Sequence, residues 1–383
     1  MDFTETPEHQ LLRESVHSIG AEFGHDYYMV CTAEKRFTEE LWQAVFRNGF
    51  GGINLPERYG GGGGGMQEVA LVVEELSAVG CPLPLLIIAC MNGPVIDEFG
   101  TDEQKQRWLP GLAAGTTRMA FAITEVNAGS NFHRLETTAA RDAGKWVING
   151  AKQFITCIDV ADSVLVVCRT GSDERGRAQL SLFVVETDAP GLSMSPIPME
   201  LRVPDRHSSV YFDDVTVPDE NLIGGVPHQA ARQVFSSLNP ERITVAAQAV
   251  GLARYFLDKA VAYAKQRTVW DEPIGAHQAV AHPLAEAKIA TDLAQLMTVK
   301  AAWLFDHGLD AGAAAGVAKL AAADAALAAL DQAIQVHGGS GLATESGLAD
   351  LWGLTRLMRV APVSKEMVLN HVSQHVLGLP RSY

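Results

Sequence analysis

A short polar stretch, Asn239-Pro240-Glu241-Arg242, places a carboxylate beside a guanidinium at the start of a predicted helix. Asn239 is a favoured N-cap, and Pro240 suits the first helical position because its missing N–H needs no partner there. Apolar residues then recur at helical spacing over 240–266. We therefore expect Glu241 and Arg242 in the first turn, at the positive end of the helix dipole, where an anionic ligand can bind. The alternative is an ordinary acidic first-turn residue next to a solvated arginine.

A second stretch, residues 121–130, reads as a strand that runs into a tight loop. Thr124 and Ser130 offer hydroxyl groups, and Gly129 lets the backbone approach a ligand closely. A plain β-turn explains the same residues, so this stretch alone does not define a site.

A third stretch predicts a hairpin with an aromatic ring near its end. Residues 146–148 and 151–155 read as strands around an Asn149-Gly150 turn. Phe154 and Thr156 share one face because side chains alternate along a strand. An aromatic ring beside a hydroxyl suits one side of a planar heterocycle, and the alternative is a packed strand end.

The charge balance of the chain argues against some classes of partner. The 383 residues carry a formal net charge of -15 at pH 7, with 47% hydrophobic and 20% charged residues. This composition is that of an ordinary globular protein. Nucleic acid and anionic membranes need a basic face, so neither is expected as the main partner. A local basic pocket for a phosphorylated ligand is still compatible with this charge.

The spacing of metal-ligating residues gives no metal or disulfide signal. The five cysteines are odd in number and include no Cys-x-x-Cys pair, so we expect a reducing compartment and no zinc site. No His/Glu spacing indicates a catalytic metal. No Gly-x-Gly-x-x-Gly follows a predicted strand, which argues against a Rossmann site.

Two apolar runs bear on membrane insertion, and neither predicts a spanning helix. The run from Pro82 to Met91 is shorter than the roughly 20 residues that a bilayer requires. The Ala-rich run 311–333 is long enough, but Lys319, Asp324 and Asp331 interrupt it, so a buried helix is expected. No basic-then-apolar leader opens the chain. The expected location is cytoplasmic.

The hydrophobic period changes twice along the chain, which predicts three domains. The expected fold class is α+β multi-domain: an N-terminal α-helical domain (1–117), a middle antiparallel β-domain (118–225) and a C-terminal α-helical bundle (226–383). The helices expected in the bundle are 228–236, 240–266, 277–307, 312–337 and 362–377. The glycine run 60–65 is expected to be a mobile connection, since its flanks lack the strand–loop–helix context of a phosphate cradle.

Taken together, these stretches resemble the acyl-CoA dehydrogenase family over essentially the whole chain. The family's Thr-Glu-x-x-Ala-Gly-Ser loop stands at 124–130, and its Asn-Gly-x-Lys-x-Trp-Ile-Thr segment stands at 149–156, with Phe154 replacing tryptophan. Its Arg-x-x-Phe…His-Gln segment is similar to 267–278, and its Gln-x-x-Gly-Gly-x-Gly segment to 335–341. The helix–β–helix order is also this family's architecture.

The resemblance implies a site for FAD and an acyl-CoA. The residues implied to line the flavin and the thioester end of the substrate are Phe121, Ile123, Thr124, Gly129 and Ser130. Phe154 is implied to pack on the isoalloxazine, Thr156 to hydrogen-bond its N5 edge, and Arg242 to contact the CoA arm. The residues implied to hold the pyrophosphate and adenosine part are Arg267, Trp270 and Gln278. Those implied to reach FAD from a neighbouring subunit are Gln335, Gly338 and Gly339.

The implied reaction removes two hydrogens from neighbouring carbons of the thioester. A base takes the α-proton, the β-hydride goes to flavin N5, and electrons pass to an electron-transfer flavoprotein. The implied assembly is a homotetramer, a dimer of dimers. The same fold can also serve as an oxidase or a reductase, or as a non-catalytic partner subunit in a hetero-oligomer.

The position of the base departs from the family's commonest pattern. Most members carry their glutamate in a Tyr-Glu-Gly-Thr loop that aligns with 361–364, where Pro362 replaces the glutamate. Proline also lacks the N–H that this loop gives to the thioester oxygen. Ser364 stands at the loop's Thr position and is expected to contact FAD. A minority of members place the base immediately before the CoA-contacting arginine, which implies Glu241 here; Glu366 is the nearest other carboxylate.

Overall fold

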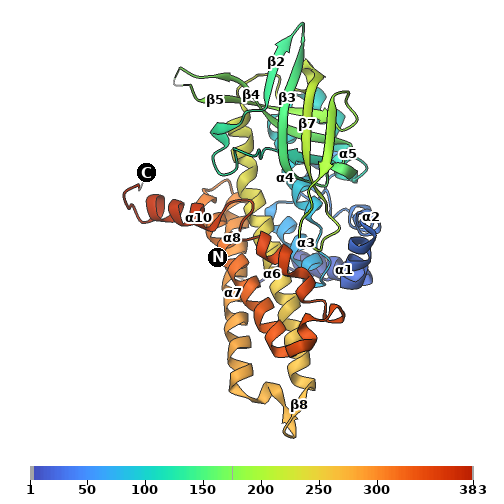
Figure 1. The fold of residues 1–383 in the computed structure, drawn as a ribbon, viewed down its shortest axis with the longest axis vertical. Coiled ribbons are helices and arrows are strands. Elements are labelled where there is room, and N and C mark those ends of the chain that lie inside the picture. Colours follow the sequence, from blue (N-terminus) through green and yellow to red (C-terminus); the bar gives the residue numbers. More distant parts are fainter. Residues whose placement is uncertain (1–3, 175, 382–383) are drawn as a thin grey trace.

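The structure is a computed structural model that describes residues 4–174 and 176–381, with one helical part before and one after a β region in the chain (Figure 1). The N-terminal helices are α1 (Pro7–Glu34), α2 (Glu39–Arg47), α3 (Met66–Ala78), α4 (Pro84–Phe99) and α5 (Asp102–Ala114). The C-terminal helices are α6 (Ala230–Gln266), α7 (Gln278–Asp306), α8 (Gly312–His337), α9 (Trp352–Leu357) and α10 (Lys365–His371). This arrangement confirms the predicted fold class.

The β region is a mixed sheet rather than the purely antiparallel one expected. Its strands are β1 (Met119–Ala122), β2 (Thr138–Asp142), β3 (Lys145–Thr156), β4 (Ser163–Ser172), β5 (Ala178–Glu186), β6 (Leu192–Pro196) and β7 (His207–Pro218). Their order is β1-β4-β2-β3-β7-β6, with β5 on β4. Strands β1 and β2 both pair with β4 in parallel. Neither strand directly precedes β4 in the chain, so no tight hairpin joins either of them to β4.

The hairpin expected at Asn149-Gly150 is wrong, because β3 runs unbroken through both residues. The turn lies instead between β2 and β3, at Ala143 and Gly144, whose φ values are 46° and 82°. A two-residue hairpin turn with both φ angles positive matches the twist of the strands it joins. Gly150 is an irregularity in the pairing of β3 with β7, where a Cβ would meet Thr137 Cα at 2.6 Å.

Helix α6 is continuous through Pro240, which corrects the predicted helix start. It begins at Ala230, so Glu241 and Arg242 lie about three turns inside it and not at its positive end. Proline inside a helix costs roughly 3 kcal/mol because it removes one hydrogen bond and crowds the preceding turn. The helix persists because its central side chains are buried against α3, α7 and α8.

Helix α8 is the Ala-rich helix of the sequence, and its apolar side chains face protein. Residues 312–342 are long and apolar enough to cross a membrane by length and composition, and 61% of the tested window is buried. In Figure 1, α8 lies against α6 and α7 in the long bundle below the β region. Its alanines allow this close packing, which agrees with the expected buried helix.

The glycine run 60–65 is a packed loop rather than the mobile connection expected. Each of its backbone N–H groups donates a hydrogen bond, five of them to carbonyls of residues 52–57 and that of Gly65 to the Glu68 carboxylate. A Cβ on Gly61 would lie 2.2 Å from Leu55 O, so this position requires glycine. With every amide already paired, the run has no donors left to cradle a phosphate.

Candidate active site

Glu241 is the most strongly perturbed carboxylate of the predicted site. It is only partly accessible to solvent, and burial raises its pKa to about 7, against the opposing charges of Arg242 and Lys319. Arg242 is also partly enclosed, which lowers its pKa, and its Nη1 donates to Asn239 Oδ1 at 3.1 Å. The pair therefore combines a carboxyl that titrates near neutral pH with a cation held one residue away.

Lys319 on α8 is a member of this site that sequence reasoning missed. Its side chain is fully buried, and its Nζ donates to the carbonyl of Val363 at 2.6 Å. Burial lowers its pKa to about 8, and the charge of Glu241 opposes that shift. The only signal in the sequence was a lysine inside an alanine run, which we treated as an interruption of a possible membrane span.

The loop after β1 is fixed against β3 by a buried ion pair. Lys152 Nζ donates to Ile123 O at 3.0 Å and to Glu125 Oε1 at 2.8 Å. The backbone N–H of Gln153 donates to Thr124 O at 2.8 Å. The structure therefore brings the Thr124–Ser130 loop and the Phe154–Thr156 strand end together, as a shared flavin site would require.

Phe154 is held out of the sheet by an irregularity in β3. Its φ is 59°, and the pairing with β7 shifts register between Lys152 and Ile155. Ile155 is buried, whereas 49% of Phe154 is exposed and Thr156 is partly exposed. The strand end thus offers an open aromatic face with a hydroxyl two residues away, which suits a planar ligand.

The residues on either side of the 124–130 loop pack against α6 close to Glu241. The rings of Phe132 and Phe235 are 5.3 Å apart, and Ile123 and Leu238 border one apolar cluster. Leu238 precedes Glu241 by three residues, so the two side chains lie on neighbouring positions of the helix surface. The loop, the end of β3 and the carboxyl therefore belong to one region of the chain.

The remaining predicted cofactor residues lie at the opposite end of the bundle. Arg267 follows α6, Trp270 lies on the hairpin of β8 (Thr268–Val269) and β9 (Glu272–Pro273), and Gln278 begins α7. The end of α8, which carries Gln335, Gly338 and Gly339, reaches the same place, since His337 stacks on Tyr263 at 4.3 Å. At 1.5 Å per residue, Arg267 is about 39 Å from Glu241 along α6, and Figure 1 shows β8 far below the sheet.

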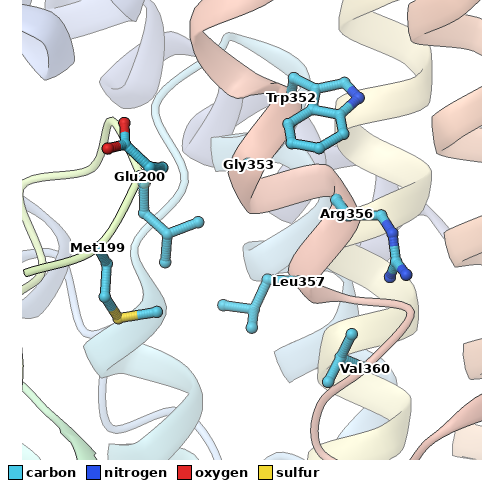
Figure 2. Close-up of a pocket in the computed structure, with 8 residues that line it drawn as sticks. Met199, Glu200, Trp352, Gly353, Arg356, Leu357 and Val360 are labelled. Carbon is cyan, nitrogen blue, oxygen red and sulfur yellow. The ribbon is translucent and has the colours of Figure 1, made fainter.

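A cavity of about 370 Å³ lies between the β region and the C-terminal helices. Figure 2 shows Met199 and Glu200 on the loop between β6 and β7, across from α9, whose Leu357 points toward that loop. That loop continues into β7, where His207 pairs with Thr156, and the wall ends at Val360, two residues before Pro362. The cavity therefore lies between the β6–β7 loop and α9, and its lining ends one residue before the loop 361–364.

The loop 361–364 itself leads into α10. Ser364 is the N-cap of α10, and its Oγ accepts a hydrogen bond from Met367 N at 3.3 Å. The expected helix 362–377 thus begins at Lys365 and ends in a π-helical turn, Val372–Val376. Glu366 lies exposed in the first turn of α10, where its own backbone N–H and Ser364 lower its pKa.

Both the fold class and the family of this chain are shown by its similarity to known proteins. The helix–β–helix fold is that of flavin-dependent acyl-CoA dehydrogenases, and the TM-score to the butyryl-CoA dehydrogenase structure of Megasphaera elsdenii is 0.93, at 28% identity over 98% of this chain and all of that one. The models of the acyl-CoA dehydrogenase N-terminal, middle and C-terminal domains match residues 6–116, 120–215 and 231–377. The chain belongs to the acyl-CoA dehydrogenase family.

Relatives of known name cover the whole length of the chain. Acyl-CoA dehydrogenase FadE12 of Mycobacterium tuberculosis is 53% identical over 384 residues, which cover 100% of this chain and 99% of the relative. A structure described as the electron transferring flavoprotein of Acidaminococcus fermentans matches with a TM-score of 0.93 and 29% identity, over 98% of this chain and 100% of that one. The protein is therefore an FAD-dependent oxidoreductase, which confirms the predicted enzyme class and cofactor.

The residues present fit such a cofactor. A Cβ built on Gly129, Gly338 or Gly339 meets no atom within 4 Å, so ligand atoms can approach the backbone at all three. Phe154 and Trp270 are large exposed aromatics, with 49% and 84% of their surface open. Exposed rings and open glycine backbone at both ends of the bundle are the surfaces that a long, partly planar dinucleotide would cover.

Proposed function

We propose that this protein catalyses the α,β-dehydrogenation of an acyl-CoA thioester to the trans-2-enoyl-CoA, with Glu241 as the base that takes the α-proton. The observation that carries this proposal is a partly enclosed carboxyl on α6, near the 124–130 loop, whose pKa is raised to about 7. A general base is most effective when its pKa lies near the working pH. Glu366 is exposed and has a lowered pKa, which makes it a weaker candidate.

The α-proton of a thioester is a weak acid, so the site must do more than supply a base. Donors are needed at the thioester oxygen to stabilise the charge that develops there. Closure by the acyl chain removes water and strengthens every charge interaction inside the site. In this proposal Arg242 contacts the CoA arm and Ser130 borders the thioester end. Bound FAD would supply the acceptor for the β-hydrogen, which leaves as hydride to flavin N5.

The cofactor cradle in this proposal has two parts that come from different chains. The residues on the strand-end side are Phe121, Ile123, Thr124, Gly129, Ser130, Phe154, Thr156 and Ser364. The residues at the far end are Arg267, Trp270, Gln278, Gln335, Gly338 and Gly339. Because about 39 Å of helix separates the two sets within one chain, we propose that all six far-end residues serve the cofactor of a neighbouring subunit.

An exposed apolar stripe on α7 supports the proposed homotetramer. Ile289, Leu293, Leu296 and Val299 recur at helical spacing, with exposed fractions from 45% to 63%. A helix face of this kind in a folded chain is covered by a partner more often than by water. The occupant we propose is the same stripe of a second copy, since a symmetric dimer interface joins identical surfaces.

The electron acceptor and the location follow from the same proposal. An electron-transfer flavoprotein is the proposed acceptor, as the resemblance to the acyl-CoA dehydrogenase family implies. A cytoplasmic location is supported by five free cysteines, all buried, because unpaired thiols are typical of reducing compartments.

A non-catalytic partner subunit is the second candidate function, and Pro362 is the observation that favours it. This residue stands where most members have their catalytic glutamate and contributes no N–H to the thioester oxygen. A chain of this kind would lend FAD- or CoA-binding surface to an active subunit. Its hallmark would be purification without flavin or without activity.

The deciding experiment is an anaerobic titration of the purified protein with short, branched and bulky acyl-CoAs, followed by the visible flavin spectrum. Bleaching of the wild-type flavin is expected, and Glu241→Gln should slow it by about 10²–10⁴-fold, the usual contribution of a general base. Glu366→Gln is the matched control and should bleach like the wild type. Bleaching that survives Glu241→Gln would move the base elsewhere, and a flavin that no thioester bleaches would favour the partner-subunit function.

A further inference from the structure

Lys319 is a buried cation that the proposed reaction does not by itself explain. Its side chain has no solvent exposure on a helix otherwise lined by alanine. Burying an ammonium is costly unless charges or hydrogen bonds compensate it. Within the described ranges 4–174 and 176–381, its hydrogen bond goes to the carbonyl of Val363 at 2.6 Å, and no carboxylate forms a direct ion pair with it.

Charged groups from three helices face Lys319, and only one of the carboxylates is both partly enclosed and without an ion-pair partner among the described residues. Asp324 of its own helix pairs with Arg359 at 2.8 Å and with Lys365 at 3.4 Å. Glu366 of α10 is exposed to solvent. Arg242 of α6 is a cation and repels Lys319, and His371 of α10 in turn faces Arg242. Glu241 of α6 is therefore the counter-charge that remains for the buried ammonium.

The hydrogen bond of Lys319 also fixes the segment in which the family's usual base is missing. Val363 follows Pro362, and its carbonyl points to the ammonium on α8. A lysine at this place thus connects the loop 361–364 with α8, which packs along α6, the helix that carries Glu241. Its ammonium therefore donates a hydrogen bond to the loop and lies close enough to the Glu241 carboxyl for their charges to interact.

We propose that Lys319 is a positioning residue for the dehydrogenation, one that holds the loop 361–364 over the site and keeps Glu241 ionised when the bound acyl chain excludes water. The inference rests on the proposed function of Glu241. A neutral carboxylic acid cannot take the α-proton, and desolvation by substrate favours the neutral form. A fixed cation nearby favours the carboxylate, and its effect grows as the site loses water.

The test replaces Lys319 by methionine, glutamine and arginine and follows flavin reduction by acyl-CoA from pH 5.5 to 9. Lys319→Met removes both the charge and the hydrogen bond, and Lys319→Gln removes the charge but keeps a donor for Val363 O. Both should shift the rising limb of the pH profile upward by about one unit, the size expected for loss of one nearby opposite charge. Lys319→Arg keeps the charge and should leave the limb near its wild-type position.

Lys365→Met is the matched control, because it removes a lysine from α10 whose partner is Asp324. Its pH profile should coincide with that of the wild type. If the Lys319 variants lose thermal stability while their rising limb stays in place, Lys319 is a structural residue only and the proposal is overturned.

A second readout does not depend on activity. The protonated-carboxyl infrared band of Glu241, assigned by its loss in Glu241→Gln, is followed through a pH titration of the flavin-loaded protein. Its midpoint should rise in Lys319→Met and Lys319→Gln and stay in place in Lys365→Met. An unchanged midpoint in both Lys319 variants would refute the proposal. If Glu241→Gln still bleaches its flavin, the assignment of the base fails instead, so the two failures can be told apart.

Discussion

The two ends of helix α6 differ in how complete they are within one chain. At the Glu241 end, α6 packs against the residues on either side of the 124–130 loop, and burial shifts the pKa of both Glu241 and Lys319. At the Arg267 end, Trp270 is 84% exposed, and Gly338 and Gly339 border open space. The Glu241 end offers a carboxyl that can accept a proton near neutral pH. The Arg267 end offers exposed aromatic and glycine surfaces that another molecule could cover.

In the site we propose, this difference means that one chain holds two halves of two different sites. The residues of the two ends are carried by a continuous helix, which fixes their separation at about 39 Å. A helix of this length, packed along its middle against α3 and α8, cannot bend to bring its ends together. In our proposal each end is completed by a second copy, so substitutions at the two ends should act independently.

The largest effect is expected from variants that damage opposite ends and are then mixed. Glu241→Gln alone should lower activity by about 10²–10⁴-fold, and Arg267→Ala alone should lose FAD and hence activity. In a hybrid dimer of the two variants, one composite site combines the intact Glu241 of one chain with the intact Arg267 of the other. Co-expression should then restore activity to about a quarter of the wild-type level, since half of randomly paired dimers are hybrids with one intact site in two.

The control for the mixing experiment is co-expression of Glu241→Gln with Lys319→Met, whose changes lie at the same end. Every composite site of that hybrid carries one of the two changes, so the activity of the mixture should not exceed the mean of its two components. If the opposite-end mixture stays as inactive as its components, each chain builds its whole site alone. Activity of the separated hybrids, measured by FAD content and flavin bleaching, decides between the two arrangements.

The next largest effect is a pH dependence of flavin reduction, which should arise from the Glu241 end alone. Burial raises the pKa of Glu241 to about 7, so below this value the carboxyl is protonated and cannot accept the α-proton. The rate of flavin reduction should rise with pH through 7 and fall about tenfold for each unit below it. Stopped-flow reduction from pH 5 to 8 measures this limb. FAD retention, followed in the same samples, should not trace the same curve, because Glu241 is not a ligand of FAD in the proposed site.

Much of the fold could be predicted because periodicity reports local structure faithfully. The expected helix 312–337 coincides with α8, and 277–307 differs from α7 by one residue at each end. The loop 124–130 and the strand end at Phe154 and Thr156 were identified from residue types and are brought together by Lys152 and Gln153. The assignment of roles to those residues and the domain boundaries after 117 and 225 remain predictions.

What the sequence did not reveal depends on contacts between distant segments. Pro240 predicts a helix start in isolation, but burial of the residues on both sides of it carries α6 through that position. Asn149 and Gly150 predict a turn, yet Asn149 exchanges hydrogen bonds with Asp214 across β3 and β7. Lys319 was missed because its partner is a backbone carbonyl 44 residues away, for which no side-chain pattern exists.

The smallest effect is expected from the middle of α6, where Arg254 lies thirteen residues from both Glu241 and Arg267. Its Nη1 donates to Glu74 at 2.6 Å, and it also pairs with Glu75; both are buried carboxylates of α3 that Arg13 of α1 contacts as well. Arg254→Met leaves these carboxylates with one guanidinium fewer. The free energy of unfolding should fall by about 1–3 kcal/mol, less than for a fully buried pair because Arg254 is partly exposed and Arg13 remains.

Denaturant unfolding of Arg254→Met measures that loss, and Lys288→Ala serves as its control, since Lys288 and Asp292 form an exposed pair whose loss should not be measurable. Because Arg254 touches neither end of the helix, its loss should change flavin reduction and FAD retention to the same small extent. A variant that impaired one end alone would show that the middle of α6 is coupled to that end, and the two ends would then no longer be independent. Equal, small changes at both ends would instead fit a rigid helix that only sets the distance between them.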